Sequence, residues 1–216
     1  MISLNQVNLQ RGSFQLKNIS MKVGQGGLHL VIGETGSGKT SIVEAICGLH
    51  PVESGQVRLR GVDVTQTSPA SRSIGYLPQD VALFGHLSVR ENLGFSCRAR
   101  KWRSKRIRQH VESLAGELGI GSLLDRYPES LSGGQKQSVA FGRALAFESD
   151  IVCLDEPFVA LDAQTRETLI DWFKNYVQQN KVTVLAVTHQ PQWLQAAADT
   201  IWNIDSQGNL SGGASS

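Results

Sequence analysis

The residues with the clearest chemistry form a glycine-rich stretch near the N-terminus. They match the phosphate-binding pattern G-x-x-x-x-G-K-[ST] and are Gly33, Glu34, Thr35, Gly36, Ser37, Gly38, Lys39 and Thr40, with Ser41 next. Glycines allow positive φ angles, so successive backbone N–H groups can point at an anion. In such a loop the lysine reaches the β- and γ-phosphates, and the threonine hydroxyl can hold Mg²⁺. The stretch predicts a nucleoside triphosphate site.

Two carboxylates follow an apolar stretch later in the chain. Asp155 and Glu156 come directly after residues 151–154, which we expect to form a buried strand. Ligands of open α/β sheets bind at the carboxyl ends of strands, so both acids should lie beside the glycine-rich loop. There Asp155 is expected to hold Mg²⁺, and Glu156 to act as general base towards the attacking water.

Two other polar residues also follow predicted strands. His189 comes after residues 182–187 and is expected to contact the γ-phosphate or to orient Glu156 and the water. Gln79 ends the strand around 74–77, and its amide is expected to contact Mg²⁺ and the water. With Lys39 and Glu156, these two residues complete the predicted catalytic set. Taken singly, both residues are weak signals, because a lone histidine is more often structural or merely exposed.

A second glycine-containing segment opens a helix predicted over about 135–148. Its residues are Ser132, Gly133, Gly134 and Gln135. The serine can cap the helix, and the glycines leave N–H groups at a positively polarised helix end. The segment therefore predicts a second anion site, with an ordinary capped helix start as the alternative.

The elements that must position these residues alternate between strands and helices. Residues 28–32 read as a buried strand, and residues 41–49 repeat apolar side chains at helical spacing. Other predicted elements are antiparallel strands within 3–9, 14–16 and 19–23, strand and turn over 54–64, a helix over about 163–180, a short helix near 191–198 and a strand over 201–204. This order predicts an α/β fold with a largely parallel core sheet.

Composition restricts the class of protein further. The chain of 216 residues, 40% hydrophobic, is long enough for one domain, which we place at 1–206 with a flexible tail at 207–216. A net charge of +2 gives no argument for nucleic acid, and three unevenly spaced cysteines suggest neither disulfides nor zinc. No signal peptide and no membrane-spanning apolar stretch is expected.

One local charge feature departs from this balance. Seven cations lie within residues 98–108: Arg98, Arg100, Lys101, Arg103, Lys105, Arg106 and Arg108. They could face an anionic membrane surface or a partner, or form a solvated helix face.

Together, these segments resemble the nucleotide-binding domains of the ATP-binding-cassette (ABC) family. The loop 33–40 matches the Walker A motif, Gln79 the Q-loop and residues 131–135, Leu-Ser-Gly-Gly-Gln, the family signature. Residues 151–156 match Walker B with its glutamate, residues 160–162 the D-loop, and His189 the switch histidine. The order and spacing agree from about residue 1 to 205.

The resemblance implies a P-loop NTPase with a RecA-like core, an antiparallel β subdomain and an α-helical subdomain inserted at about 80–139. It implies ATP and Mg²⁺ as cofactors, with Thr40, Gln79 and Asp155 around the metal. It also implies a head-to-tail dimer, expected to be a homodimer, in which Ser132 to Gln135 of one copy contact ATP bound by the other.

The chain departs from the family pattern at four places. Glu34 replaces the usual proline, Val159 replaces the common D-loop serine, and Ser138 follows Gln137 where arginine is familiar. An aromatic residue usually stacks on adenine near residue 11, where this chain has Arg11 with Phe14 nearby. Either residue could take that role, Arg11 through its guanidinium plane.

Residues 82–93 are similar to importer subunits that serve molybdate, thiamine, iron and related solutes. This likeness implies that integral membrane permease subunits dock near residues 79–93, with a solute-binding protein acting through the permease. The expected location is the cytoplasmic face of the cell membrane, as a peripheral subunit without nucleic acid. The alternatives are an ABC ATPase of a non-transport complex, such as lipoprotein release or cell division, and a soluble ABC protein of DNA repair or translation.

Overall fold

The computed structural model describes residues 1–215 and divides the chain into two compact units. The first unit contains residues 1–74, 150–156 and those from 176 onwards. The second unit contains residues 75–149 and 157–175, so it extends beyond the predicted helical insertion at 80–139 on both sides.

A parallel sheet forms the centre of the first unit. Its strands are β3 (Gly27–Ile32), β7 (Ile151–Asp155), β8 (Thr183–Thr188) and β9 (Thr200–Ile204), in the spatial order β9-β3-β8-β7. The residues of β7 and β8 are all buried, as expected for strands covered on both faces. Ile32 pairs with Thr188 and Asp155 with Val187, so three strands end at the same edge.

The end of the chain differs from the predicted loose tail. Leu210–Ser215 form strand β10, which pairs antiparallel with β9 from Leu210 opposite Ile204. Asp205 organises the turn between them, because its Oδ1 accepts the N–H groups of Gln207 at 2.9 Å and Asn209 at 2.8 Å. An aspartate that bonds the backbone two residues on is a turn signal, so a turn and a strand occur within this Gly/Ser-rich segment.

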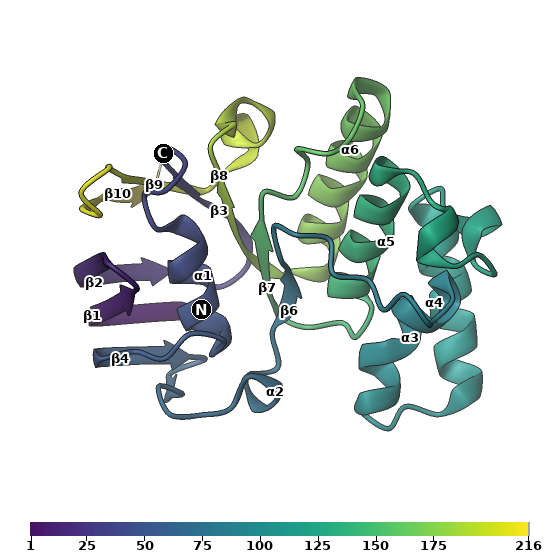
Figure 1. The fold of residues 1–216 in the computed structure, drawn as a ribbon, viewed down its shortest axis with the longest axis horizontal. Helices are drawn as coiled ribbons and strands as arrows, with labels where there is room; N and C mark the ends of the chain where they lie inside the picture. The colour runs from purple at the N-terminus through teal and green to yellow at the C-terminus, as the bar shows by residue number, and fades with distance from the viewer. Residues whose placement is uncertain (216) are drawn as a thin grey trace. The chain divides into compact units, whose positions relative to one another are not determined.

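An antiparallel sheet forms the other layer of the first unit, where the sequence predicts one. Its strands are β1 (Ile2–Arg11), β2 (Phe14–Val23), β4 (Ser54–Leu59) and β5 (Val62–Asp63), in the order β2-β1-β4-β5. Helix α1 (Lys39–Cys47) packs between this sheet and strands β7 and β8, so its apolar residues are buried against both (Figure 1). The short helix α2 (Pro69–Arg72) follows β5.

The second unit is built mainly of helices. It contains β6 (Gly75–Leu77), α3 (Val89–Ala99), α4 (Ser104–Glu117), α5 (Gly133–Leu145) and residues 163–175 of α6 (Ala163–Asn180). Helix α3 packs against both α4 and α5 around a core that includes Leu93, Val111 and Val139, all fully buried (Figure 1). Two 3₁₀ turns, Gly121–Leu123 and Pro128–Ser130, lie between α4 and α5.

Three smaller features complete the description. The helix expected near 191–198 is two 3₁₀ turns, Pro191–Trp193 and Gln195–Ala197. Cys47, Cys97 and Cys153 are all buried free thiols. Within residues 1–215, no helix has both the length and the apolar character needed to span a bilayer.

Candidate functional site

The glycine-rich loop joins β3 to α1 in the conformation that an anion cradle requires. Gly38 is the N-cap of α1 and has φ +99°, a left-handed conformation that disfavours residues with a side chain. A Cβ atom on Gly38 would lie 2.9 Å from the ring of Phe14 and from Leu16. Glycine is therefore needed here both for the backbone angle and for the close approach of β2. As a result, the N-terminus of α1 opens directly onto the loop.

Lys39 is the first residue of α1, and its side chain turns back over the loop. Its Nζ donates to the carbonyl oxygens of Gly33 at 2.8 Å and Glu34 at 2.7 Å, and the residue is only 6% exposed. Burial lowers the pKa of Lys39, while the charges of Glu156 and Asp155 act to raise it. The ammonium group therefore lies within the loop, close to the strand-end acids.

Two buried polar side chains at this edge have no partner among the described residues. One is the Ser37 hydroxyl in the loop, and the other is Asp155, neither of whose carboxylate oxygens accepts a hydrogen bond. Asp155 is 1% exposed, and burial is the main cause that raises its pKa to about 6. Buried polar groups are nearly always paired in proteins, so these atoms indicate a site for a polar ligand.

This arrangement fits a magnesium nucleotide better than a metal held by protein alone. Among residues 1–215, no group of three or more His, Cys, Asp or Glu side chains could hold an ion. Mg²⁺ usually takes one or two protein oxygens and completes its shell with phosphates and water. Asp155 at the end of β7 and Thr40 in the first turn of α1 are the residues that would hold it.

Glu156, directly after β7, is held more firmly than Asp155. Its Oε2 accepts the Thr188 hydroxyl at 2.8 Å, and its Oε1 accepts the backbone N–H of His189 at 2.9 Å. Its backbone lies in the left-handed region at φ +49°, which is strained for a residue with a side chain. Such strain persists where the surroundings fix a conformation, and it is typical of functional sites.

His189 contacts the same carboxylate with its ring. Nδ1 lies 2.6 Å from Glu156 Oε1, and the side-chain amide of Gln190 donates to Nε2 at 3.2 Å. This pattern places the ring proton on Nδ1, from where it donates to Glu156. Of the two roles predicted for His189, the structure thus shows the contact with Glu156.

Thr188 was not among the predicted site residues, yet it donates to Glu156 from the last position of β8. It follows four apolar residues and precedes His189, so the polar residue at the strand end was the available signal. Asn203 and Pro191 were also not identified. With Ile32, Gly33, Glu34, Thr35 and His189 they line a hollow of about 430 Å³ beside the loop.

The remaining predicted site residues belong to the second unit. Ser132 is the N-cap of α5, where its hydroxyl accepts the Gln135 N–H at 3.3 Å and its own N–H donates to Gln135 Oε1 at 3.1 Å. Ser132 and Gly133 are exposed, and Gly134 is partly buried. Gln79 is also exposed, two residues after β6. Their expected roles in nucleotide or metal binding stay predictions.

The two candidates for adenine stacking have different surroundings. Arg11 pairs with Glu44 of α1, with 2.7 Å between Nη1 and Oε2, while its side chain stays 56% exposed. Phe14 is partly buried, with its ring against Gly38 of the loop. Phe14 therefore packs as part of the loop's support, and Arg11 presents a guanidinium held by a carboxylate.

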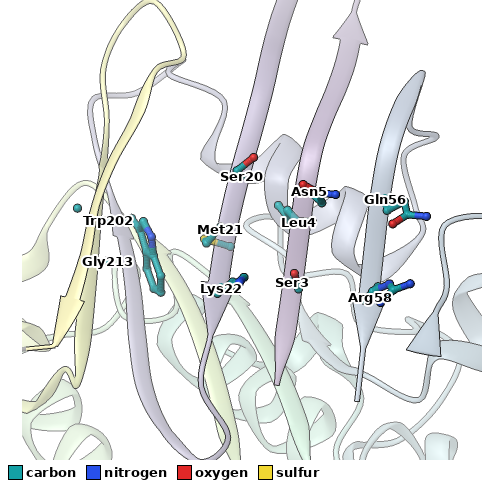
Figure 2. Close-up of a pocket in the computed structure, with 11 residues that line it drawn as sticks. Ser3, Leu4, Asn5, Ser20, Met21, Lys22, Gln56, Arg58, Trp202 and Gly213 are labelled. Carbon is teal, nitrogen blue, oxygen red and sulfur yellow. The ribbon is translucent and has the colours of Figure 1, made fainter. Parts of the chain in front are cut away.

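A second, larger hollow of the first unit lies away from the loop. It measures about 610 Å³ and runs over β1, β2 and β4 as far as Trp202 and Gly213 (Figure 2). Lys22 and Arg58 lie in its lining, with the remainder contributed by Ser3, Leu4, Asn5, Ser20, Met21, Gln56 and Gly212. None of these eleven described residues is acidic or histidine, so the hollow offers no general base or carboxylate ligand.

Comparisons with known proteins assign the chain to a family of ATP-binding proteins. A family model described as ABC transporter matches residues 16–159, more than half of the chain. The sulfate/thiosulfate import ATP-binding protein CysA of Synechococcus elongatus is 41% identical over 201 residues, which cover 93% of this chain and 58% of that protein. The molybdate/tungstate import ATP-binding protein WtpC of Thermococcus kodakarensis is 41% identical over 176 residues, covering 82% and 53%. The chain therefore spans little more than half the length of these relatives.

Solved structures show the same fold. The dimeric bacterial ABC transporter cassette MJ0796 aligns with a TM-score of 0.88 at 24% identity over 98% of both chains. The same cassette in a post-hydrolysis state, bound to ADP and Pi, aligns with the same score, identity and coverage. The predicted fold class is thus confirmed, and the chain belongs to the ABC transporter family.

Proposed function

We propose that this chain binds ATP with Mg²⁺ and hydrolyses it to energise a membrane importer. The observation that carries the proposal is the pair of acids after β7, set beside a phosphate-binding loop. Asp155 is buried with both oxygens unpaired, and Glu156 is held by three hydrogen bonds. One acid is thus available to a ligand, while the other is oriented by the protein.

The loop supplies the phosphate contacts in this proposal. Backbone N–H groups of residues 33–40 and the N-terminus of α1 bind the phosphates, and the unpaired Ser37 hydroxyl donates to them. Lys39 exchanges its two carbonyl partners for β- and γ-phosphate oxygens. Mg²⁺ would be held by Thr40 and Asp155, and when bound it offsets the phosphate charge. Gln79 is proposed to contact the metal and the water through its side-chain amide.

Glu156 is proposed as the general base that orients the attacking water and takes its proton. The Thr188 hydroxyl and the His189 N–H fix both oxygens of the carboxylate, so its direction is set before substrate binds. His189 keeps its proton on Nδ1 towards Glu156 and is positioned to stabilise the carboxylate. Preorganised donors of this kind reduce the reorganisation needed during reaction.

Arg11 is proposed as the platform for adenine. Its exposed guanidinium is held by Glu44, and guanidinium planes stack on aromatic rings. Phe14 instead supports Gly38, so its replacement would disturb the loop as a whole.

We further propose that a second copy of the chain completes the ATP-binding site. The exposed Ser132 and Gly133 and the partly buried Gly134 and Gln135 at the start of α5 would contact the γ-phosphate of the partner's nucleotide. The solved cassette that this chain resembles is described as dimeric, which supports a homodimer.

The proposed permease contact lies at residues 79–93, where hydrogen bonds from Asn92 hold the loop before α3. Asn92 is fully buried, and its side-chain amide donates to the carbonyls of Phe84, Leu87 and Ser88, while its Oδ1 accepts the Phe84 N–H. The Phe84 ring lies 4.4 Å from that of Phe95, which is 42% exposed. A preformed loop with an exposed aromatic surface suits the docking of a partner helix.

Docking on a permease would place the chain at the cytoplasmic face of the membrane as a peripheral subunit, with a solute-binding protein acting through the permease. The named relatives import sulfate/thiosulfate and molybdate/tungstate. Their names support a tetrahedral oxyanion as the solute, rather than thiamine or iron.

The Glu156→Gln variant tests the proposal. It keeps the size of the side chain but removes the base, so ATP turnover should fall by about 10²-fold or more while ATP still binds. Turnover and equilibrium binding of ATP would be measured on the same samples. Glu167→Gln, an exposed change on α6, is the control and should leave both unchanged. Wild-type turnover in Glu156→Gln would remove Glu156 as the base.

A further inference from the structure

The turn between α3 and α4 concentrates positive charge to an unusual degree. Residues 92–111 contain seven of the 21 cations of the chain and none of its 19 acids. The other residues therefore carry 14 cations against 19 acids, a net charge of −5. The small overall charge of +2 thus conceals a strongly basic segment in an otherwise acidic chain.

Some of these cations are neutralised within the second unit, and others are not. Arg106 pairs with Glu148 at 2.7 Å and Arg108 with Glu112 at 3.1 Å. Lys101, Arg103 and Lys105 are exposed and form no ion pair with any residue from 1 to 215. We call these three residues the basic turn.

The basic turn lies where positive charge weakens the helix that follows it. Arg103 is the N-cap of α4 and makes no side-chain cap, Lys105 lies in the first turn, and that turn contains no acid. Cations at a helix N-terminus oppose the helix dipole, and serine, threonine, asparagine or aspartate are the favoured caps. Helix α3, in contrast, has Ser88 and Glu91 in a full capping box. A local rule broken without structural gain indicates a functional constraint.

The surroundings of the basic turn favour a fluid anionic surface over nucleic acid. The nearby aromatic rings are already covered by cations: Arg106 lies 3.6 Å above Trp102, and Arg100 lies 4.3 Å above Phe147. Single-stranded nucleic acids bind mainly by stacking on free aromatic faces. Long, exposed and unpaired side chains instead suit phospholipid headgroups, which move to meet the charges.

We propose that Lys101, Arg103 and Lys105 dock on anionic phospholipid headgroups of the membrane. The contact adds to the permease contact, because a patch of a few cations alone gives weak and reversible adhesion. The proposal rests on the proposed function only in locating the chain at a membrane, and the catalytic residues do not take part.

The test is binding of the full chain to vesicles. Vesicles of phosphatidylcholine alone are compared with vesicles that also contain phosphatidylglycerol, at low and high salt, by sedimentation. The wild type should bind only the anionic vesicles, and high salt should release it. Each cation near such a surface contributes roughly fivefold to partitioning, so Lys101→Gln/Arg103→Gln/Lys105→Gln should bind on the order of 100-fold more weakly.

The charge-matched control is Lys17→Gln/Lys22→Gln/Arg58→Gln. These three exposed cations of the first unit also lack ion pairs among the described residues, and two of them line the hollow of Figure 2. The control removes the same charge and should keep vesicle binding within about twofold of the wild type.

The proposal would be overturned if the wild type did not bind anionic vesicles, or if both triple variants lost vesicle binding equally. It would also be overturned if the basic-turn variant lost binding to a single-stranded RNA oligonucleotide while its vesicle binding stayed unchanged. ATP turnover measured on the same samples separates failure of the lipid-binding proposal from failure of the proposed function. Turnover without vesicles should be the same in the wild type and in both triple variants.

Discussion

At the scale of single residues, the two acids at the edge of the parallel sheet have different environments. Burial raises the pKa of Asp155 to about 6, whereas the carboxylate of Glu156 is fixed by Thr188 and His189. A buried, unpaired carboxylate such as Asp155 suits a ligand of a cation. A carboxylate held in one orientation, such as Glu156, suits a general base. The difference predicts separate responses to mutation.

Thr188→Val should lower the turnover number without a matching change in KM. The substitution keeps the shape of the side chain but removes a donor to Glu156, and a hydrogen bond to a charged group of this kind corresponds to about tenfold or more in rate. Steady-state kinetics measure the effect. Thr183→Val at the opposite end of β8 removes a comparable bond, from the Gly26 N–H at 2.8 Å, and should leave turnover near the wild type. Equal effects of both variants would argue against a positioning role for Thr188.

Asp155→Asn should stabilise the nucleotide-free protein in a pH-dependent way. The pKa of Asp155 in the folded state, about 6, exceeds its ordinary value of 3.8, so the folded protein binds more protons between these values. Its stability contribution is therefore present below pH 4 and lost as the pH rises through 6. The variant should be more stable by on the order of 2 kcal/mol at pH 7.5, and the gain should vanish towards pH 4.

Chemical denaturation across this pH range measures the difference between Asp155→Asn and the wild type. The same variant should lose Mg²⁺-dependent turnover, because an amide binds the ion far less well than a carboxylate. A gain that does not change with pH would mean that Asp155 titrates normally.

At the scale of elements, the N-termini of the helices decide both stability and function. Helix α1 begins at Gly38 and opens onto the loop, α5 begins with an exposed Ser132 cap, and α4 begins among cations. Helix α3 alone among these four combines a capping box with an acid in its first turn. The starts of α1 and α4 thus lack a side-chain cap, whereas those of α3 and α5 are closed by capping boxes.

Arg103→Ser/Lys105→Glu should raise the thermal stability of the protein. The change provides a cap and an acid in the first turn of α4, together worth about 1 kcal/mol, or roughly 2–4 °C in Tm for a domain of this size. Calorimetry or circular dichroism measures the shift. Ser88→Ala, which removes the cap of α3, is the opposite control and should lower the stability by about 1 kcal/mol. An unchanged or lower Tm in the double variant would contradict the claim that the cations at its N-terminus weaken α4.

The sequence predicts these elements unevenly, for physical reasons. The strands before the loop and before Asp155 could be predicted because buried parallel strands are short apolar stretches. Strand β10 could not, because Leu210 is one apolar residue among glycines and serines and its pairing with β9 is set by a turn. Thr188 was missed because nothing in its local sequence shows that its hydroxyl meets Glu156, 32 residues away.

At the scale of the whole molecule, the predicted site is shared between copies. The phosphate loop and the acids lie in the first unit, and the signature residues at the start of α5 lie in the second. A symmetric head-to-tail dimer would join each loop to the signature of the other copy and form two equal sites.

A mixture of two inactive variants tests this arrangement. Lys39→Ala should impair phosphate binding, and Ser132→Arg should block the partner's site while leaving ATP binding to its own loop nearly intact. Mixed in equal amounts, they should recover about a quarter of wild-type turnover, because half of the dimers would contain one intact site out of two. Turnover measured across mixing ratios should peak near equal amounts. A mixture as inactive as its components would contradict a site shared between copies.

The division of the chain has one more consequence. One of the places where the chain passes from the first unit to the second lies between Glu156 and Pro157, so the proposed base directly precedes a proline. Proline holds its own φ near about −65° and restricts the residue before it, and Glu156 already has φ +49°. Few backbone conformations are therefore open to Glu156, and the direction of its carboxylate is set by the main chain as well as by Thr188 and His189.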